Sequence, residues 1–304
     1  MKTFNHLFVV LEANNDTQPA LMRAEQIALL NKARITLCLG ANSRMHQIEK
    51  DIAALGDSVS EAQIHQLLTD NCQKFLKKLA EPLQKKAIQI EFSLGWSDDA
   101  VDGIIEAVEK SKADLVIKSS RHHSKIKTLF YTPTDWKLLR KCPAPILMVH
   151  SEKPHLPQNM LAAVSALAID EEHSKLDLQV LDYASSISQL FQAKLKVINA
   201  FTPVPLGVSL DGTGVYQDEY LQDLQQEHHL KTLELTRKFS ISDDQVETRH
   251  GDTNSAITEC VTELNIDMVI MGTIAREGLA GLFIGNTAEK ILESLDCEIL
   301  TVKI

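Results

Sequence analysis

Two stretches of this chain align with each other without a gap: DLVIKSSRHHSKIKTLFYTPTDWKLLRKCPAPILMV, from Asp114 to Val149, and DMVIMGTIAREGLAGLFIGNTAEKILESLDCEILTV, from Asp267 to Val302. They lie 153 residues apart, and eleven positions are identical between them. Weaker matches, interrupted by short loop insertions, extend the likeness to earlier parts of the chain, among them Leu7 with Leu161, Ala33 with Ala193 and Gly95 with Gly251. Self-similarity at one period indicates a duplicated domain.

The repeat divides the chain of 304 residues into two domains and a connecting segment. We expect a first domain over residues 1–150, a linker over residues 151–159 and a second domain over residues 160–304. The segment HSEKPHLPQN, residues 150–159, is polar and contains Pro154 and Pro157, which suits a linker. Domains of about 150 residues are long enough to bury a sizeable apolar core.

Each copy alternates short apolar runs with longer amphipathic segments. In the first copy the runs predict strands over Leu7–Leu11, Ile35–Leu39, Ile88–Ser93, Asp114–Ile117 and Ile146–Val149. The segments between them predict helices over Ala20–Lys32, Glu61–Lys86, Asp98–Lys110 and Thr134–Lys141. In the second copy we expect strands over Met160–Ala166, Leu195–Phe201, Val246–Arg249, Asp267–Met271 and Glu298–Val302. The predicted fold class is α/β, with two tandem (βα)4β domains on five-stranded parallel sheets.

Composition and charge exclude several classes of protein. The chain has 31 Lys and Arg against 41 Asp and Glu, a net charge of −10, and 44% hydrophobic residues. These values argue against a disordered or collagen-like chain, and they give no strong nucleic-acid signal. The apolar run from Leu7 ends at Glu12, too early for a signal peptide, and no run approaches the roughly 18 apolar residues that span a membrane.

The cysteines predict a reducing environment. They are odd in number, widely spaced and without a C-x-x-C pair: Cys38, Cys72, Cys142, Cys260 and Cys297. We interpret them as reduced thiols of a cytoplasmic protein.

The loop after the fourth strand of the second copy is the candidate ligand site, because parallel α/β sheets bind ligands beyond the carboxyl ends of their strands. It reads GTIAREGLAGLFIG, residues 272–285, and contains four of the chain's 12 glycines. Glycine lets backbone N–H groups approach an anion closely. Asn286-Thr287-Ala288-Glu289 then opens a helix, whose free N–H groups and positive dipole end favour a phosphate.

A structural interpretation of these residues stays open. Asn286 and Glu289 have the spacing of a capping box, and the glycines would then only shape a turn. The matched loop of the first copy, residues 119–132, has no glycine and leads into Pro133, which lacks an N–H, and Asp135, which repels phosphate. We therefore expect no phosphate site in the first copy.

The loop of the first copy is basic. It contains Lys118, Arg121, Lys125 and Lys127 with no acid between them, together with His122 and His123. Two interpretations stay open: a solvated patch, or a contact with an anion or an acidic partner through Arg121, His122, His123 and Lys125.

The chain resembles the universal stress protein family over essentially its full length, and in particular the branch with two tandem domains, to which FYTPTDWKLLRKCPAPILMV, residues 130–149, is similar. Nucleotide-binding members of this family carry G-x2-G-x9-G followed by Ser or Thr around a triphosphate. The second copy keeps this spacing with Gly272, Ala275 and Gly285, and has Asn286 followed by Thr287 where the hydroxyl belongs.

The resemblance implies further features. The fold would be of the adenine-nucleotide alpha-hydrolase-like type, with the two copies packed as an intrachain pseudo-dimer through their last strands. An acid is expected at the end of the first strand, near the nucleotide, where the copies have Glu12 and Ser165. The first copy therefore keeps the acid without the glycine loop, and the second keeps most of the loop without the acid. The candidate ligand-binding residues are Ser165, Gly272, Thr273, Ala275, Gly285, Asn286 and Thr287.

Other chemistry is scarce in the sequence. There is no G-x4-G-K-[ST], H-E-x-x-H or G-x-S-x-G motif, and we assign no catalytic residue and no metal ligand. His228, in a predicted helix around Tyr220–Phe239, follows Leu221 and Leu224 at helical spacing, which favours a packed or surface histidine over a ligand. The Pro- and Gly-rich segment 202–216 is either an irregular surface loop or a wall of the ligand site.

Three functions follow from these observations. The leading hypothesis is a non-enzymatic cytoplasmic stress-response protein, whose second domain binds a small anionic or nucleotide-like ligand such as ATP, with no cofactor certain, and whose first domain is a scaffold. The alternatives are a slow ATPase that holds phosphates with Gly272, Gly285 and Asn286, and an interaction scaffold without a ligand. A homodimer formed on top of the pseudo-dimer stays open.

Overall fold

The computed structural model describes residues 2–13, 15, 17–40, 52, 60–97, 99–120, 131–150, 154–167, 171–203, 215–273, 276–278 and 281–304. Of residues 100, 215–218, 276–278 and 281–283 it describes the backbone alone. Several predictions lie outside the described residues: Ala275, the basic residues Arg121, His122, His123 and Lys125, and most of the segment 202–216. The described chain divides into two compact units, one from residues 3–120 and 131–155, the other from Lys2 and residues 156–304.

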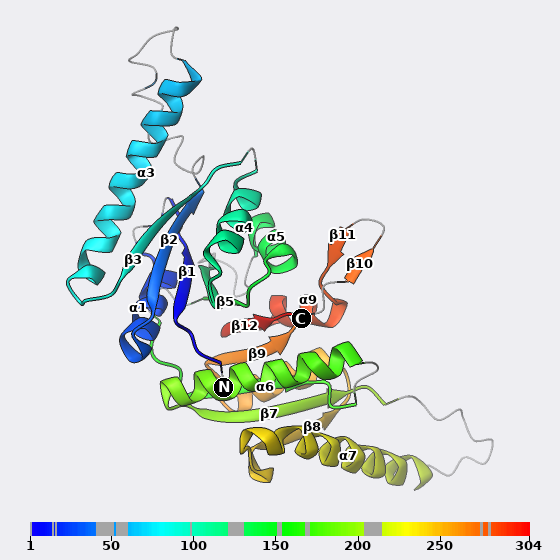
Figure 1. Cartoon of the computed structure of the whole chain (residues 1–304). Helices are drawn as coiled ribbons and strands as arrows, with labels where there is room; N and C mark the ends of the chain where they lie inside the picture. The colour runs from blue at the N-terminus through cyan, green and yellow to red at the C-terminus, as the bar shows by residue number, and fades with distance from the viewer. Residues whose placement is uncertain are drawn as a thin grey trace. The chain divides into compact units, whose positions relative to one another are not determined.

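The first unit is built on five parallel strands in the order β3-β2-β1-β4-β5 (Figure 1). These are β1 (His6–Val10), β2 (Arg34–Gly40), β3 (Ile90–Gly95), β4 (Leu115–Ser119) and β5 (Ile146–Val149). Its helices are α1 (Pro19–Asn31), α3 (Glu61–Gln84), α4 (Ala100–Ser111) and α5 (Pro133–Lys141). Every strand and helix predicted for this copy is present, with bounds shifted by at most two residues.

The second unit repeats this topology, with the parallel order β8-β7-β6-β9-β12. Its strands are β6 (Asn159–Val164), β7 (Lys194–Phe201), β8 (Val246–His250), β9 (Met268–Gly272) and β12 (Glu298–Val302). Its helices are α6 (Glu171–Phe191), α7 (Val215–Thr236), α8 (Thr253–Glu263) and α9 (Asn286–Ser294), with short 3-10 turns at Arg237–Phe239 and Asp243–Gln245. The predicted duplicated α/β fold is confirmed, while the pseudo-dimeric packing of the copies stays a prediction.

The inner strands are buried and mainly apolar because helices cover both of their faces. All five residues of β1 are buried, as are all five of β4. The edge strand β3 instead includes the polar residues Glu91 and Ser93 and is at least partly exposed at five of its six positions. This contrast is expected of parallel sheets, whose inner strands lose contact with water on both sides.

The aspartate that is identical in the two copies, Asp114 and Asp267, has the same structural role in both. The Asp114 carboxylate accepts the N–H groups of Asn5 and His6 at 2.7 and 2.8 Å. Asp267 accepts those of Gln158 and Asn159 at 2.8 and 2.9 Å. In each copy this aspartate joins the start of the fourth strand to the start of the first, which explains its presence in both.

The glycine-rich stretch contains an element that was not predicted. Within it, β10 (Arg276–Gly278) and β11 (Gly281–Phe283) form a two-stranded antiparallel hairpin. Gly278 and Gly281 are partners at its turn end. At least two of the four glycines therefore belong to a hairpin, and the stretch is not a single loop.

Candidate functional site

The second unit brings three segments to one edge of its sheet. Ser165 follows β6, Gly272 ends β9, and the two strands are parallel neighbours, with Ala163 opposite Met271. The strand order reverses between β6 and β9, which is where such sheets bind ligands. Because α9 runs from this edge back to β12, Gly285 and the first residues of α9 lie at the same edge.

The start of α9 has no side-chain cap. Its N-cap residue is Gly285, at φ −60° and ψ 142°, so Asn286 is already the first helical residue. The predicted capping box of Asn286 and Glu289 is therefore wrong, and the Glu289 N–H instead donates to the Gly285 carbonyl at 3.0 Å. Among the described residues no side chain caps the first-turn N–H groups, and residues 285–287 are exposed. Such N–H groups, at the positive end of the helix dipole, are the kind that anions bind.

Gly272 and Gly285, the two glycines that match the spacing of the family motif, differ in what surrounds them. A Cβ at Gly285 would have no heavy atom of the described residues within 4 Å, so the space beside it is open. A Cβ at Gly272 would lie 2.4 Å from Cδ2 of Leu176 on α6. Gly272 thus permits close packing of α6 on β9, whereas Gly285 leaves the helix start accessible.

Thr273 is placed differently from the other candidates. It is 1% exposed, and its N–H and hydroxyl both donate to the Val302 carbonyl, at 2.8 and 3.4 Å. Thr273 therefore joins the end of β9 to β12, and its hydroxyl is engaged inside the domain.

The end of β6 rests on a carboxylate that no sequence signal predicts. Asp177 on α6 accepts the N–H groups of Ser165 and Ala166 at 3.0 and 3.1 Å. Burial raises the pKa of Asp177, and the two N–H donors act in the opposite direction. An acid thus lies beneath the loop in which the family resemblance expects one, but it comes from a helix and is bound to the backbone.

A buried polar pair supports the same loop. The Asn199 side chain is fully buried, and its Nδ2 donates to the carbonyls of Val164 and Ser165 at 3.0 and 2.7 Å. Its Oδ1 lies 2.7 Å from Nδ1 of His228, which stacks on Phe201 with ring centroids 3.8 Å apart. Burial lowers the pKa of His228. His228 is therefore a packed histidine, as predicted, and it positions Asn199.

The equivalent helix start in the first unit is closed by the protein itself. Thr132 caps α5, Pro133 is the first helical residue, and Asp135 accepts the N–H and the hydroxyl of Thr132, each at 2.7 Å. Lys118 Nζ lies 2.5 Å from Asp135 Oδ1, and the two side chains are 8% and 0% exposed. Lys118 is thus a buried partner of Asp135, which corrects its assignment to a solvated patch.

The cysteines, all of which lie in the described part of the chain, show no sign of an activated thiol. All five cysteines are buried and none is in a disulfide, as predicted. Burial raises the pKa of Cys38 and Cys297 to about 12 and that of Cys260 to about 11, although Arg249 lies near Cys260. Within the described ranges no group of three or more His, Cys, Asp or Glu could hold a metal ion.

No helix in the described part of the chain combines the length and the apolar character needed to cross a bilayer.

Comparison with known proteins gives a consistent result. The model of the universal stress protein family matches residues 3–150 and again residues 166–303. The universal stress protein E homolog of Haemophilus influenzae is 28% identical over 305 residues, covering 99% of this chain and 97% of the relative. Universal stress protein E of Escherichia coli K12 is 25% identical, covering 100% of this chain and 95% of the relative.

Solved structures agree at the level of the whole chain. A crystal structure of a Pseudomonas aeruginosa protein described as a universal stress protein has a TM-score of 0.75 at 25% identity, covering 99% of this chain and 93% of that one. A universal stress protein from Archaeoglobus fulgidus has a TM-score of 0.69 at 16% identity, covering 99% of both chains, and so shares the fold. This chain therefore belongs to the universal stress protein family and carries two of its domains in tandem.

Proposed function

We propose that the second domain of this stress protein binds a small anionic or nucleotide-like ligand, such as ATP, at the start of α9, without catalysing a reaction. The first domain acts as a scaffold, and the protein works in the cytoplasm. The proposal rests on one observation: the start of α9 is uncapped and open at Gly285, whereas Asp135 closes the equivalent start of α5.

The polar groups at this edge suit a phosphate. Backbone N–H groups of the first helical turn can donate to anionic oxygens, and the helix dipole adds a favourable field. The side chains of Asn286 and Thr287 are exposed beside them and can add further donors. Ser165, at the end of β6, provides a second wall of the site.

The nearby described side chains do not supply an activated nucleophile or base, which favours binding over hydrolysis. Thr273 uses its hydroxyl on Val302, and His228 is buried against Asn199 and Phe201. A general base must reach the proton that it removes, and neither side chain faces the open helix start.

The test is calorimetric titration of the full-length protein with ATP, with and without Mg²⁺, and with inorganic phosphate. Gly285→Asp places a carboxylate at the helix start, where it accepts the first-turn N–H groups and repels phosphate, so affinity should fall at least about tenfold. Thr134→Asp adds the same charge at the matched helix start of the first domain and should leave affinity unchanged.

Native mass spectrometry of protein purified from cells would identify the retained ligand. Equal ATP affinity of the wild type and Gly285→Asp would contradict the proposed site. ATP turnover that Gly285→Asp abolishes would favour the slow-ATPase alternative, and no binding of any nucleotide would favour the ligand-free scaffold.

A further inference from the structure

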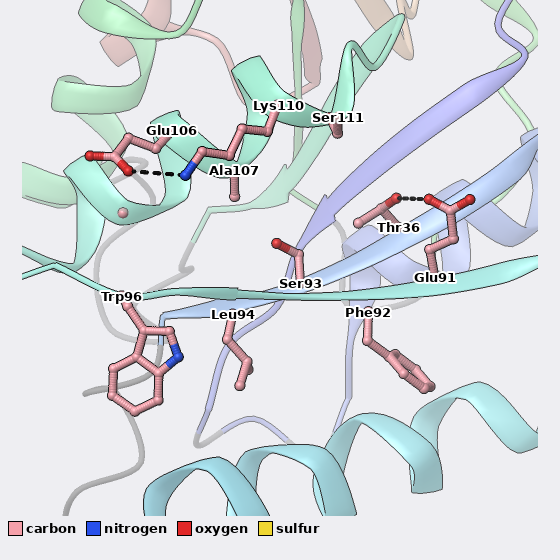
Figure 2. A pocket seen from close by; sticks show the side chains of 11 residues that line it. Thr36, Glu91, Phe92, Ser93, Leu94, Trp96, Glu106, Ala107, Lys110 and Ser111 are labelled. Atoms are coloured by element: carbon pink, nitrogen blue, oxygen red, sulfur yellow. Dashed lines mark hydrogen bonds and ion pairs between the residues drawn. The ribbon is translucent and has the colours of Figure 1, made fainter. Parts of the chain in front are cut away.

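A cavity of about 360 Å³ lies in the first domain, between the edge strand β3 and helix α4 (Figure 2). Its polar end, at Thr36 and Glu91, is near the amino ends of β2 and β3. The candidate phosphate site is in the other domain, at carboxyl strand ends. The cavity is therefore separate from the proposed function and needs its own explanation.

The cavity has a polar floor and a roof of small residues. Figure 2 shows Glu91 and Ser93 on the side of β3 that faces α4, while Phe92, Leu94 and Trp96 point the opposite way. The roof is formed on α4 by Gly103, Ala107 and Ser111, which lie four residues apart. Glu106 and Lys110, 3.5 Å apart, stand at the exposed rim.

Close packing at one end of α4 explains why the space exists. A Cβ at Gly103 would lie 2.8 Å from the Gly95 carbonyl carbon, so helix and strand already touch there. Further along the helix, Ala107 and Ser111 face the short side chain of Ser93 and leave a gap.

A chain of hydrogen bonds beneath the cavity runs in one direction, from Arg34 through His6 and Thr36 to Glu91. Arg34 Nη2 lies 3.0 Å from His6 Nδ1, and a guanidinium can only donate, so Nδ1 accepts. His6 Nε2 then carries the proton and donates to Thr36 Oγ1 at 2.7 Å. The Thr36 hydroxyl is left to donate to Glu91 Oε2 at 3.4 Å, which orients this carboxylate beside the cavity.

In the second domain, charged side chains occupy the space that corresponds to this cavity. The Arg34 N–H donates to the Asn5 carbonyl, and the Lys194 N–H donates to the equivalent carbonyl of Gln158. Thr36 and Lys196, each two residues later, are therefore equivalent. Ser93 pairs with Cys38 and Glu247 with Ile198, which makes Ser93 and Glu247 equivalent as well. Lys196 and Glu247 form an ion pair at 3.3 Å, where the first domain has two hydroxyls.

A second ion pair of the second domain lies between the corresponding edge strand and helix, β8 and α8. Arg249 on β8 lies 2.6 Å from Glu263 on α8. In the first domain the carboxylate beside the cavity is that of Glu91. Its Oε1 lies 3.8 Å from Arg34 Nε, and both side chains are nearly half exposed. The first domain thus has the Glu91 carboxylate beside the cavity, but it has Thr36 at the position of Lys196, whose ammonium fills the corresponding space in the second domain.

We propose that this cavity binds a small organic cation, namely a primary ammonium or guanidinium group on a short aliphatic chain, where the second domain uses its own Lys196. Glu91 is the counter-ion, Ser93 and Thr36 offer oxygen acceptors, and Ala107 contacts the aliphatic chain. A cavity at the small end of the roughly 300–1,000 Å³ range of ligand pockets suits such a molecule, and the net charge of −10 favours its approach.

The experiment titrates the full-length protein with agmatine, n-butylamine and the neutral isostere 1-butanol by calorimetry. Both amines should bind at least tenfold more tightly than 1-butanol. Glu91→Gln removes the counter-ion at nearly constant shape and should weaken amine binding at least tenfold. The same substitution at a carboxylate of the second domain, Glu247→Gln, should leave it unchanged.

A second variant keeps the test decisive if Glu91→Gln is poorly folded. Thr36→Lys supplies an internal ammonium, as in the second domain, and should abolish amine binding while the thermal transition is retained. The proposal is overturned if 1-butanol binds as tightly as n-butylamine, if neither variant changes amine affinity, or if no amine binds at millimolar concentration. ATP titration of Glu91→Gln separates this result from the phosphate site, because its nucleotide affinity should equal that of the wild type.

Discussion

The starts of helices α5 and α9 occupy equivalent places in the two domains, but side chains cap the first and no side chain caps the second. In the first domain Asp135 caps the helix from inside and pairs with Lys118. At the equivalent positions, 153 residues later, the second domain has Ala288 and Met271, and the helix begins at an uncapped glycine. A duplicated backbone can therefore close a helix start or leave it uncapped through changes at a few positions, because the N–H groups of the first turn are backbone donors that a side chain can occupy.

The largest expected effect comes from breaking the internal pair. Asp135→Ala leaves the buried ammonium of Lys118 without its carboxylate and should lower the free energy of unfolding by about 3–5 kcal/mol, measured by urea denaturation. The double variant Lys118→Met with Asp135→Ala transplants the residues of the second domain. It should recover most of this loss, since apolar replacement of a buried pair is often neutral.

A loss below about 1 kcal/mol in Asp135→Ala would show that the pair is not a stabilising element of the first domain. The double variant should still bind no phosphate at α5, because Pro133 has no N–H and Thr132 remains as the cap.

The next effect concerns Gly272, whose equivalent in the first domain is Ser119. The Ser119 hydroxyl accepts the Ala20 N–H at 3.0 Å, whereas Gly272 makes room for Leu176. Gly272→Ala should therefore cost about 1–3 kcal/mol through overpacking. Gly285→Ala, which meets open space, is the matched control and should cost much less. Leu176→Ala combined with Gly272→Ala should be less than additive, and strict additivity would contradict the contact.

A smaller effect is the pH dependence of stability that His228 contributes from the second domain. Burial holds the pKa of His228 below its unfolded value of 6.5, so the unfolded state binds more protons below that pH. The contribution of His228 to stability is present above pH 6.5 and is lost as the pH falls below it. Urea unfolding from pH 8 to pH 5 should show this loss in the wild type.

The double variant Asn199→Leu with His228→Leu should reduce that slope, because it replaces the polar pair by an apolar one, like Leu39 at the equivalent strand position. His6 adds a slope of the same sign, since burial lowers its pKa too, and the variant isolates the part from His228. An unchanged slope would show that the imidazole of His228 is equally easy to protonate in both states.

The smallest expected effect is a cap added to α9. Gly285→Ser supplies the hydroxyl that Thr132 provides for α5, and a Cβ at this position has no atom of the described residues within 4 Å. Stability should rise by a few tenths of a kcal/mol, seen as a small upward shift of the thermal transition. A decrease would indicate that Gly285 is needed for its backbone conformation after all.

The elements of the fold follow closely from the sequence because inner strands such as β1 and β4 are mainly apolar and the repeat fixes their correspondence. The site follows less well. The capping-box spacing of Asn286 and Glu289 fits a helix that begins one residue later than α9 does, and only the backbone at Gly285 distinguishes the two cases. The hairpin of β10 and β11 consists of two three-residue strands, too short to show a periodic pattern.

The sequence by itself determined the duplication, the strand and helix order, the family and the uneven distribution of glycine, because these depend on local pattern and on position along the chain. Tertiary structure alone decided which carboxylate lies under the end of β6, which side chain fills the helix start of each domain, and where the first domain lacks a lysine that the second has. Each of these features joins residues that are distant in the chain, such as Lys118 with Asp135 or Thr36 with Glu91, and the contact exists only once the strands and helices have packed.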